Sequence, residues 1–235
     1  MQAELTRENL SHEFQVMLAG LQAHLQTAPE PDWQQLLTPA VDWEQVLRLC
    51  QHHEVTPLVY ESLGKHADKV PAEGLAHLKQ QVLKDKKSSL HLAKVLQDLL
   101  AAFEREGIEV LPYKGIVLSQ QLFADIAKRP TKDLDLVVQK KEYGRARDLL
   151  LAQGFTGPFT GLGKLATPQQ EKLILESSHH HVFYGHRLQL ELHFEIMPPS
   201  GHESFTLREL WDNLENSHYG AYAIKGMSSE QLLFV

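Results

Sequence analysis

The stretch that decides the fold is LPYKGIVLSQQLFADIAKRPTKDLDLVV, residues 111–138. It overlaps a short β-rich segment, 108–113, which we predict to be a strand because glycines bound it on both sides. Residues 114–123 carry apolar side chains at helical spacing and predict a helix. A second strand is predicted at 133–138, and it begins with two aspartates two positions apart. The stretch therefore predicts a strand, a helix and a second strand that carries two carboxylates.

The two aspartates project from one face of their strand, because side chains alternate along a strand. Asp133 and Asp135 then share a polar face, and Leu134 and Leu136 enter the core. Neighbouring carboxylates repel one another, and strands disfavour aspartate. A hard divalent cation resolves this repulsion, because Mg²⁺ takes oxygen ligands and commonly binds one or two carboxylates with a substrate phosphate. The alternative is a solvated polar face on an antiparallel sheet.

A later strand, predicted at 187–196, supplies a matching carboxylate. Its sequence RLQLELHFEI alternates apolar and polar residues, and Glu191 lies on the polar face. If this strand pairs beside the first, Glu191 completes a three-carboxylate site with Asp133 and Asp135. Two ions held there can activate an attacking oxygen and stabilise a leaving phosphate. We therefore expect these three residues to be metal ligands and catalytic residues.

Basic residues and a glycine near the predicted helix suit a bound phosphate. Backbone N–H groups at a helix N-terminus bind phosphate, and Gly115 allows a close approach. Lys114 adds a positive charge, and Arg129 or Lys132 can contact a nucleotide from the loop before the aspartates. A simple strand-to-helix turn explains Gly115 without any ligand.

The chain has 14 histidines, and several lie in or near a predicted strand at 179–184. We predict that a turn at Gly185-His186 joins this strand to the next one. A zinc site is disfavoured, because no cysteine lies nearby and adjacent histidines on a strand point to opposite faces. We expect His179 or His181 to line the cleft and contact substrate, or to be exposed.

The N-terminal part of the chain predicts helices. Apolar residues recur at spacings of three and four from Leu10 to Leu25 and again over residues 71–106. Asp42 is the expected N-cap of a shorter helix between them. We therefore predict an α+β fold, with a helical region at 1–106 and an α/β domain at 107–235. The terminal SSEQLLFV predicts a serine-capped helix start, so we expect this domain to continue beyond it.

Composition excludes several classes of protein. No stretch approaches the roughly 20 apolar residues that a membrane-spanning helix requires, so we expect no membrane partner. The N-terminus lacks the basic and apolar segments of a secretory signal, and the single cysteine, Cys50, fits a reducing cytoplasm. The net charge of −7 means that only a local basic patch would attract nucleic acid.

Three motifs together resemble a known family. They are KG at 114–115, RPTKDLDLVV at 129–138 and LELHF at 190–194. In this combination they are similar to the uncharacterised bacterial nucleotidyltransferase family of the nucleotidyltransferase (DNA polymerase beta-like) superfamily, over about residues 40–235. The resemblance implies a mixed β-sheet flanked by helices.

The resemblance also implies the roles of the site residues. Asp133, Asp135 and Glu191 would hold the metal, and Gly115 would lie near the phosphates. His193 matches a histidine of the family, and we group it with Lys114, Gly115, Arg129 and Lys132 as the nucleotide-binding residues.

The implied activity is transfer of a nucleoside monophosphate from an NTP to an acceptor hydroxyl, with two Mg²⁺ or Mn²⁺ ions as cofactors. The acceptor stays open among protein, RNA, a sugar and a small molecule. Three residues depart from the superfamily pattern: Ile116 after the glycine, Glu191 in place of aspartate, and Lys132 before the first aspartate. The alternatives are a non-catalytic nucleotide- or partner-binding module on the same fold, or a metal-dependent phosphohydrolase.

Overall fold

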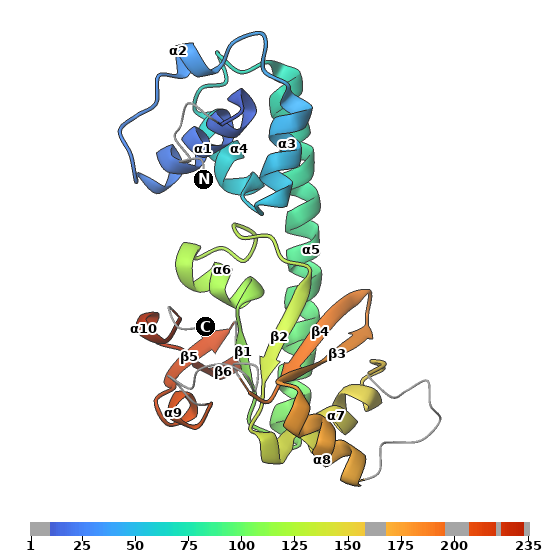
Figure 1. Ribbon diagram of the computed structural model, residues 1–235. Helices are drawn as coiled ribbons and strands as arrows, with labels where there is room; N and C mark the ends of the chain where they lie inside the picture. Colours follow the sequence, from blue (N-terminus) through green and yellow to red (C-terminus); the bar gives the residue numbers. More distant parts are fainter. Residues whose placement is uncertain (1–9, 158–167, 196–206, 220–221, 233–235) are drawn as a thin grey trace, which may run out of the picture. The chain divides into compact units, whose positions relative to one another are not determined.

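The computed structural model describes residues 10–157, 168–195, 207–219 and 222–232 (Figure 1). The chain forms two compact units, which are residues 1–89 with 123–131 and residues 90–122 with 132–235. This division falls inside the long helix α5, whereas the predicted domain boundary is residue 106.

Helices predominate, and the strands come after the long helix, so the predicted α+β class is confirmed. The elements in chain order are α1 (His12–Leu25), α2 (Trp33–Leu36), α3 (Trp43–His52), α4 (Thr56–Gly64), α5 (Ala72–Arg105), β1 (Leu111–Tyr113), α6 (Gly115–Phe123), β2 (Asp133–Val137), η2 (Lys140–Glu142), α7 (Tyr143–Ala152), α8 (Pro168–Ser177), β3 (His180–Gly185), β4 (Leu188–His193), α9 (Leu207–Asp212), β5 (Glu215–Tyr219), β6 (Tyr222–Gly226) and α10 (Ser229–Leu232). Residue 196, the predicted end of the last long strand, lies outside the described residues.

The first unit is a small helical domain with its own apolar core. Helices α1, α3 and α4 and the start of α5 contribute fully buried residues, among them Val16, Val46, Val59, Leu63 and Leu78. The predicted cap of α3 is confirmed, because the Asp42 carboxylate accepts a hydrogen bond from the backbone N–H of Gln45 at 3.0 Å. Such a cap stabilises a helix by about 1 kcal/mol.

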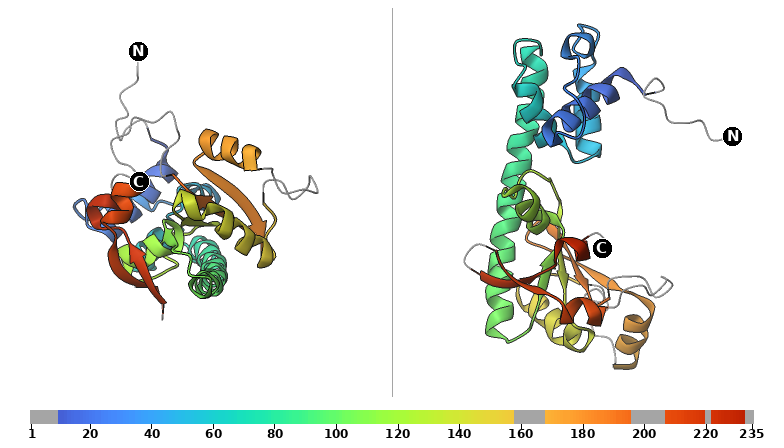
Figure 2. Two further views of the ribbon diagram at one scale, coloured as in Figure 1. Left: turned by 90° about the horizontal axis from the view of Figure 1, so that it is seen from below. Right: turned by 90° about the vertical axis from the view of Figure 1, so that its left-hand side faces the viewer.

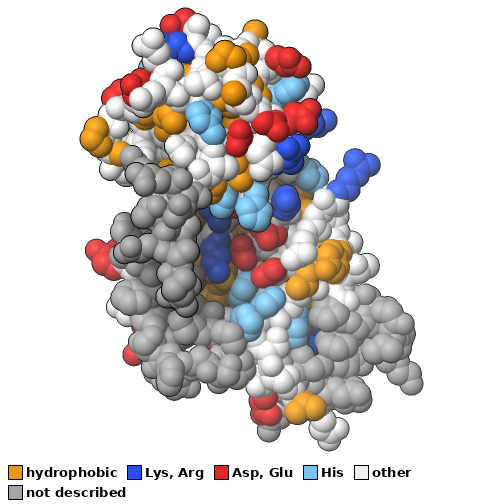
Figure 3. Space-filling view, turned by 45° about the horizontal axis from the view of Figure 1, so that its top comes forward, with side chains coloured by type: hydrophobic (Ala, Val, Ile, Leu, Met, Phe, Trp, Pro, Cys, Tyr) orange, Lys and Arg blue, Asp and Glu red, His pale blue; other side chains and the backbone are white. Residues whose placement is uncertain are grey.

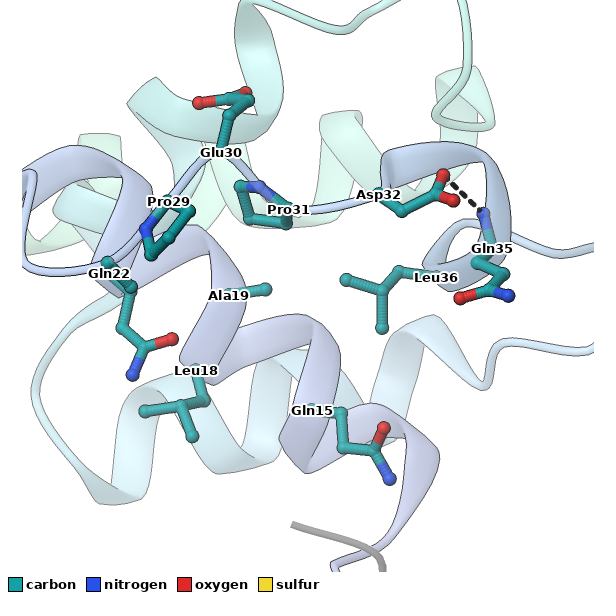
Figure 4. Close-up of a pocket in the computed structure, with 11 residues that line it drawn as sticks. Gln15, Leu18, Ala19, Gln22, Pro29, Glu30, Pro31, Asp32, Gln35 and Leu36 are labelled. Atoms are coloured by element: carbon teal, nitrogen blue, oxygen red, sulfur yellow. Dashed lines mark hydrogen bonds between the residues drawn. The ribbon is translucent and has the colours of Figure 1, made fainter.

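A pocket of about 320 Å³ lies in the first unit, lined by α1, α2 and the proline-containing segment between them (Figure 4). Glu30 on this segment accepts a hydrogen bond from Trp33 Nε1 at 2.6 Å and lies 3.3 Å from His66 Nε2. Among the described residues, the lining includes none of the predicted site residues.

The second unit is built on a mixed four-stranded sheet of order β1-β2-β4-β3. Strand β2 runs parallel to β4 and antiparallel to β1, and β3 runs antiparallel to β4. The second half of α5 runs alongside this sheet in Figures 1 and 2. The mixed sheet implied by the family resemblance is therefore confirmed.

One face of the sheet is apolar and the other polar. Buried leucines of β2 and β4 lie opposite one another on the apolar face, where Leu134 pairs with Leu190 and Leu136 with Leu192. Each fully buried leucine stabilises the fold by about 2 kcal/mol relative to an exposed one. The intervening residues of both strands face the other side, as the alternating pattern predicts.

The predicted turn between β3 and β4 was wrong by one residue. Strand β3 continues through Gly185, and the two turn residues are His186 and Arg187, with φ of 50° and 64°. Glycine is needed at 185 for packing, because a Cβ there would lie 2.8 Å from Cδ1 of Phe155. The glycine that seemed to indicate the turn instead makes room for a core ring.

The C-terminal segment packs against the β1 edge of the sheet. Leu210 and Met227 share a buried cluster with Leu111 and Val137. The predicted serine cap of the last helix is confirmed, because Ser228 and Gln231 exchange side-chain-to-backbone hydrogen bonds at 2.8 and 3.2 Å. Within the described residues, every helix is too short or too polar to cross a membrane.

Candidate metal and nucleotide site

Two carboxylates meet on the polar face of the sheet. Asp135 of β2 lies directly opposite Glu191 of β4 in the parallel pairing. Because paired residues share a face, both side chains project from the same side. The pairing of these two strands, which the expected three-carboxylate site requires, is therefore present.

His193 joins the two carboxylates. Its Nε2 lies 3.4 Å from Asp135 Oδ1 and 3.3 Å from Glu191 Oε2. One ligand atom from each of Asp135, Glu191 and His193 lies within 4.8 Å of the others, close enough to hold a single metal ion. Carboxylate oxygens and an imidazole nitrogen are common ligands of divalent cations.

Asp133 lies on the same face but one step further along β2, opposite Gln189. Two residues along a strand span roughly 6.6 Å, which separates it from the carboxylate of Asp135. Among the described residues, the compact ligand group therefore holds two carboxylates and a histidine, with Asp133 beside it. Gln189 Nε2 donates a hydrogen bond to Glu191 Oε1 at 3.1 Å and so orients that carboxylate.

The imidazole of His193 is held in a buried position. Its side chain is 6% exposed, and its Nδ1 lies 3.3 Å from the hydroxyl of Tyr113. Its Nε2 is buried and has no hydrogen-bond partner among the described residues. Burial, with the nearby charges of Asp135 and Glu191, raises the pKa of Tyr113, so this phenol stays neutral.

Two further histidines border the group. The His180 ring stacks on His193 at 4.9 Å between centroids, and its Nε2 lies 3.8 Å from Glu191 Oε2. The His179 ring lies 6.1 Å from that of His193. Burial, followed by the neighbouring histidines, lowers the pKa values of both His179 and His180, which favours neutral rings.

Of the two histidines expected to line the cleft or to be exposed, His181 does neither. It lies on the other face of the sheet, where its Nδ1 is 2.5 Å from the hydroxyl of Tyr143. The antiparallel register explains this, because His180 pairs with His193 whereas His181 pairs with the buried Leu192. Burial lowers the pKa of His181 to about 4.

The predicted phosphate-binding pair lies at the same edge of the sheet. The Lys114 Nζ lies 4.8 Å from the centre of the Tyr113 ring, and its charge contributes to the lowered pKa of His180. Lys114 and Gly115 both adopt left-handed backbone conformations, with φ of 55° and 44°. Gly115 begins α6, and the Ile116 side chain that follows is 1% exposed. The first turn of α6 thus offers backbone N–H groups without a hydroxyl at residue 116.

The other two predicted nucleotide contacts precede β2 in the chain. Arg129 belongs to the first unit, where it lies 3.9 Å from Glu54. Lys132 is exposed and directly precedes β2. Figure 3 shows histidine and acidic side chains side by side on one face of the molecule, with lysine or arginine next to them.

A second pocket, of about 260 Å³, lies in the second unit but away from these carboxylates. The end of α5, the segment before β1 and the β5–β6 hairpin line it. Trp211 Nε1 at its rim donates a hydrogen bond to Glu109 at 3.3 Å. Its described lining includes no member of the Asp135, Glu191 and His193 group.

The mixed sheet and its flanking helices are of the nucleotidyltransferase type. The chain belongs to the uncharacterised nucleotidyltransferase family, whose model matches residues 39–235. The matched region agrees with the extent of the resemblance in the sequence, so the family assignment is confirmed, and with it the class of enzyme. No curated protein and no solved structure matches the chain.

Proposed function

We propose that the protein transfers a nucleoside monophosphate from an NTP to an acceptor hydroxyl in a metal-dependent reaction. The observation that carries this proposal is the group of Asp135, Glu191 and His193, whose ligand atoms lie within 4.8 Å of one another. Family membership supports nucleotide transfer in general terms. The group supplies the acidic site that such a transfer uses.

The residues present fit a divalent cation. Two carboxylates directly opposite one another repel, and the buried Nε2 of His193 points at both of them without a hydrogen bond. We assign Asp135 and Glu191 as ligands, with Asp133 as the carboxylate that extends the site for a second Mg²⁺ or Mn²⁺ ion. The bound ions would stabilise the charge of the leaving phosphate and activate the attacking oxygen.

The chain's own groups would then bind and orient the substrates. Lys114 and the backbone N–H groups at the start of α6 would bind the triphosphate. Glu191 would accept the proton of the attacking hydroxyl if that oxygen lies within hydrogen-bond reach of it. Arg129 and Lys132 remain predicted nucleotide contacts.

Calorimetric titration of each of the four NTPs, with and without Mg²⁺ or Mn²⁺, tests this function. We expect metal-dependent binding in the wild type that disappears in the Asp133→Asn, Asp135→Asn double variant. The control is Asp98→Asn, which removes an exposed carboxylate of α5 that pairs with Lys94. A wild-type protein that binds no NTP with either ion contradicts the proposal.

The second candidate is a non-catalytic nucleotide-binding module, and the buried Ile116 in the first turn of α6 favours it. A hydroxyl-bearing residue there would offer a triphosphate a hydrogen bond that Ile116 cannot offer. The products formed from a bound NTP distinguish the candidates. The incubation contains a candidate acceptor of each class: protein, RNA, sugar and small molecule. Pyrophosphate release with a labelled acceptor indicates nucleotidyl transfer, free phosphate indicates a phosphohydrolase, and an intact nucleotide with every acceptor indicates the module.

A further inference from the structure

We infer that His193 is itself a ligand of the metal and that the site therefore prefers Mn²⁺ to Mg²⁺. The inference rests on the metal site of the proposed function and goes beyond it, because it names the third ligand and the ion. His193 was predicted above only as a nucleotide contact.

The first observation is the position of the His193 imidazole. Nε2 lies almost equally far from the two carboxylates, at 3.4 Å from Asp135 and 3.3 Å from Glu191. The side chain is 6% exposed, and no described residue hydrogen-bonds this nitrogen. Buried polar atoms in folded proteins nearly always have a partner, so an orphaned nitrogen between two carboxylates indicates a missing ligand.

The second observation is the position of Tyr113, which lies where a hydrogen-bond partner of the other ring nitrogen of His193 is expected. A histidine that binds a metal through one ring nitrogen normally uses the other to donate a hydrogen bond, which selects its tautomer. The hydroxyl oxygen of Tyr113 lies 3.3 Å from His193 Nδ1, in position to accept such a hydrogen bond. Nδ1–H can therefore donate to this oxygen, which leaves the lone pair of Nε2 directed at the carboxylates.

The types of ligand atom then determine which metal ion the site prefers. Mg²⁺ prefers oxygen ligands and gives up its water reluctantly, whereas imidazole nitrogen binds first-row transition ions better. A set of one nitrogen and two carboxylates suits Mn²⁺, which accepts both kinds of ligand. An all-carboxylate site of Asp133, Asp135 and Glu191 would lack this preference.

His180 provides a matched control within the same cluster. It stacks on His193 at 4.9 Å, but its Nε2 lies 3.8 Å from Glu191 and it is not part of the compact ligand group. The same substitution at the two positions therefore separates loss of a ligand from loss of a neighbouring ring.

The experiment measures Mn²⁺ affinity from the electron paramagnetic resonance signal of free Mn²⁺, and Mg²⁺ affinity by competition, in the absence of nucleotide. We expect His193→Asn to weaken Mn²⁺ binding by at least about tenfold and Mg²⁺ binding much less. His180→Asn should leave the ratio of the two affinities unchanged. Asparagine keeps a polar group near Tyr113 while it removes Nε2.

An unchanged affinity ratio in His193→Asn overturns the inference. If that variant does not fold, as judged by its thermal transition, Tyr113→Phe takes its place, and it too should weaken Mn²⁺ more than Mg²⁺. If the wild type binds NTP in a metal-dependent way but His193→Asn has the same ratio of Mn²⁺ to Mg²⁺ affinity, only the role of His193 is overturned and the proposed function stands. A wild-type protein that binds neither ion, with or without NTP, overturns the proposed function as well.

Discussion

Two tyrosine–histidine pairs lie on opposite faces of the same sheet, and their surroundings differ. On the apolar face, the Tyr143 hydroxyl lies 2.5 Å from His181 Nδ1, and both rings pack edge-on against Phe194. On the polar face, the Tyr113 hydroxyl lies 3.3 Å from His193 Nδ1. The other nitrogen of His193 meets carboxylates.

The comparison shows that residue type alone does not identify a functional histidine. Both histidines are buried, and both lie close to a tyrosine hydroxyl. Only His193 has a buried nitrogen that lacks a hydrogen-bond partner among the described residues and lies between two acidic groups. A polar atom left unsatisfied by the fold is a stronger indication of a site than the histidine itself.

The largest expected effect comes from the polar face. Asp135→Asn should lower metal-dependent NTP affinity by at least about 100-fold, because it removes a charged ligand. Without metal, the free energy of unfolding should stay the same or rise by up to about 1 kcal/mol, since Asp135 and Glu191 no longer repel. Calorimetry and urea unfolding measure the two quantities. If Asp135→Asn instead lowered the free energy of unfolding so far that part of the protein was unfolded, unfolding would explain the lost binding. That outcome would contradict the separation of the two faces.

Removing each tyrosine hydroxyl tests the pairs directly. Tyr143→Phe should lower the free energy of unfolding by about 1–3 kcal/mol, because it removes the hydroxyl 2.5 Å from Nδ1 of the buried His181. Tyr113→Phe should cost less than about 1 kcal/mol, since its hydrogen bond is longer, and it should act on Mn²⁺ affinity instead. Urea unfolding of both variants, side by side, is the measurement. Equal losses of stability would show that both pairs are structural.

The pH dependence of stability reports on the apolar face. His181 has a pKa of about 4 in the folded protein against 6.5 for an ordinary histidine, so the unfolded chain takes up a proton first as the pH falls. The contribution of His181 to the free energy of unfolding is fully present above pH 6.5 and is lost as the pH falls towards 4. We expect the wild type to lose on the order of 1–2 kcal/mol between pH 7 and pH 5 from this residue.

His181→Gln is the comparison for that measurement. The variant should be less stable at pH 7, but its stability should fall less steeply between pH 7 and pH 5. Burial also lowers the pKa values of His24, His179 and His180, and these shifts act in the same direction in both proteins. Stability curves of equal slope would show that His181 does not cause the pH dependence.

The alternation of apolar and polar residues was enough to predict both faces of the sheet. It placed Glu191 and His193 on the polar side and the leucines of β2 and β4 in the core, as the structure has them. It did not predict which residue of β4 pairs with which aspartate of β2, because tertiary packing determines the register of a parallel pair of strands. Asp135, rather than Asp133, therefore lies opposite Glu191.

The same limit applies to residues whose position depends on long-range packing. The sequence left open whether His179 or His181 lines the cleft or is exposed, and it gave no sign that the strand register buries His181 against Tyr143. Arg129 precedes the aspartates closely in sequence and belongs to the first unit, where the neighbouring Lys128 pairs with Glu61, and its contact with a nucleotide stays a prediction.

The smallest expected effect concerns the hairpin that carries both histidines. Arg187 has a φ of 64° in the turn between β3 and β4, a conformation that glycine adopts without strain. Arg187→Gly should therefore raise the free energy of unfolding by about 0.5–1 kcal/mol. Because the turn lies at the other end of β4 from His193, Mn²⁺ affinity should not change. A gain in stability accompanied by weaker Mn²⁺ binding would show that the hairpin turn and the polar face are coupled, and that the two faces are not independent.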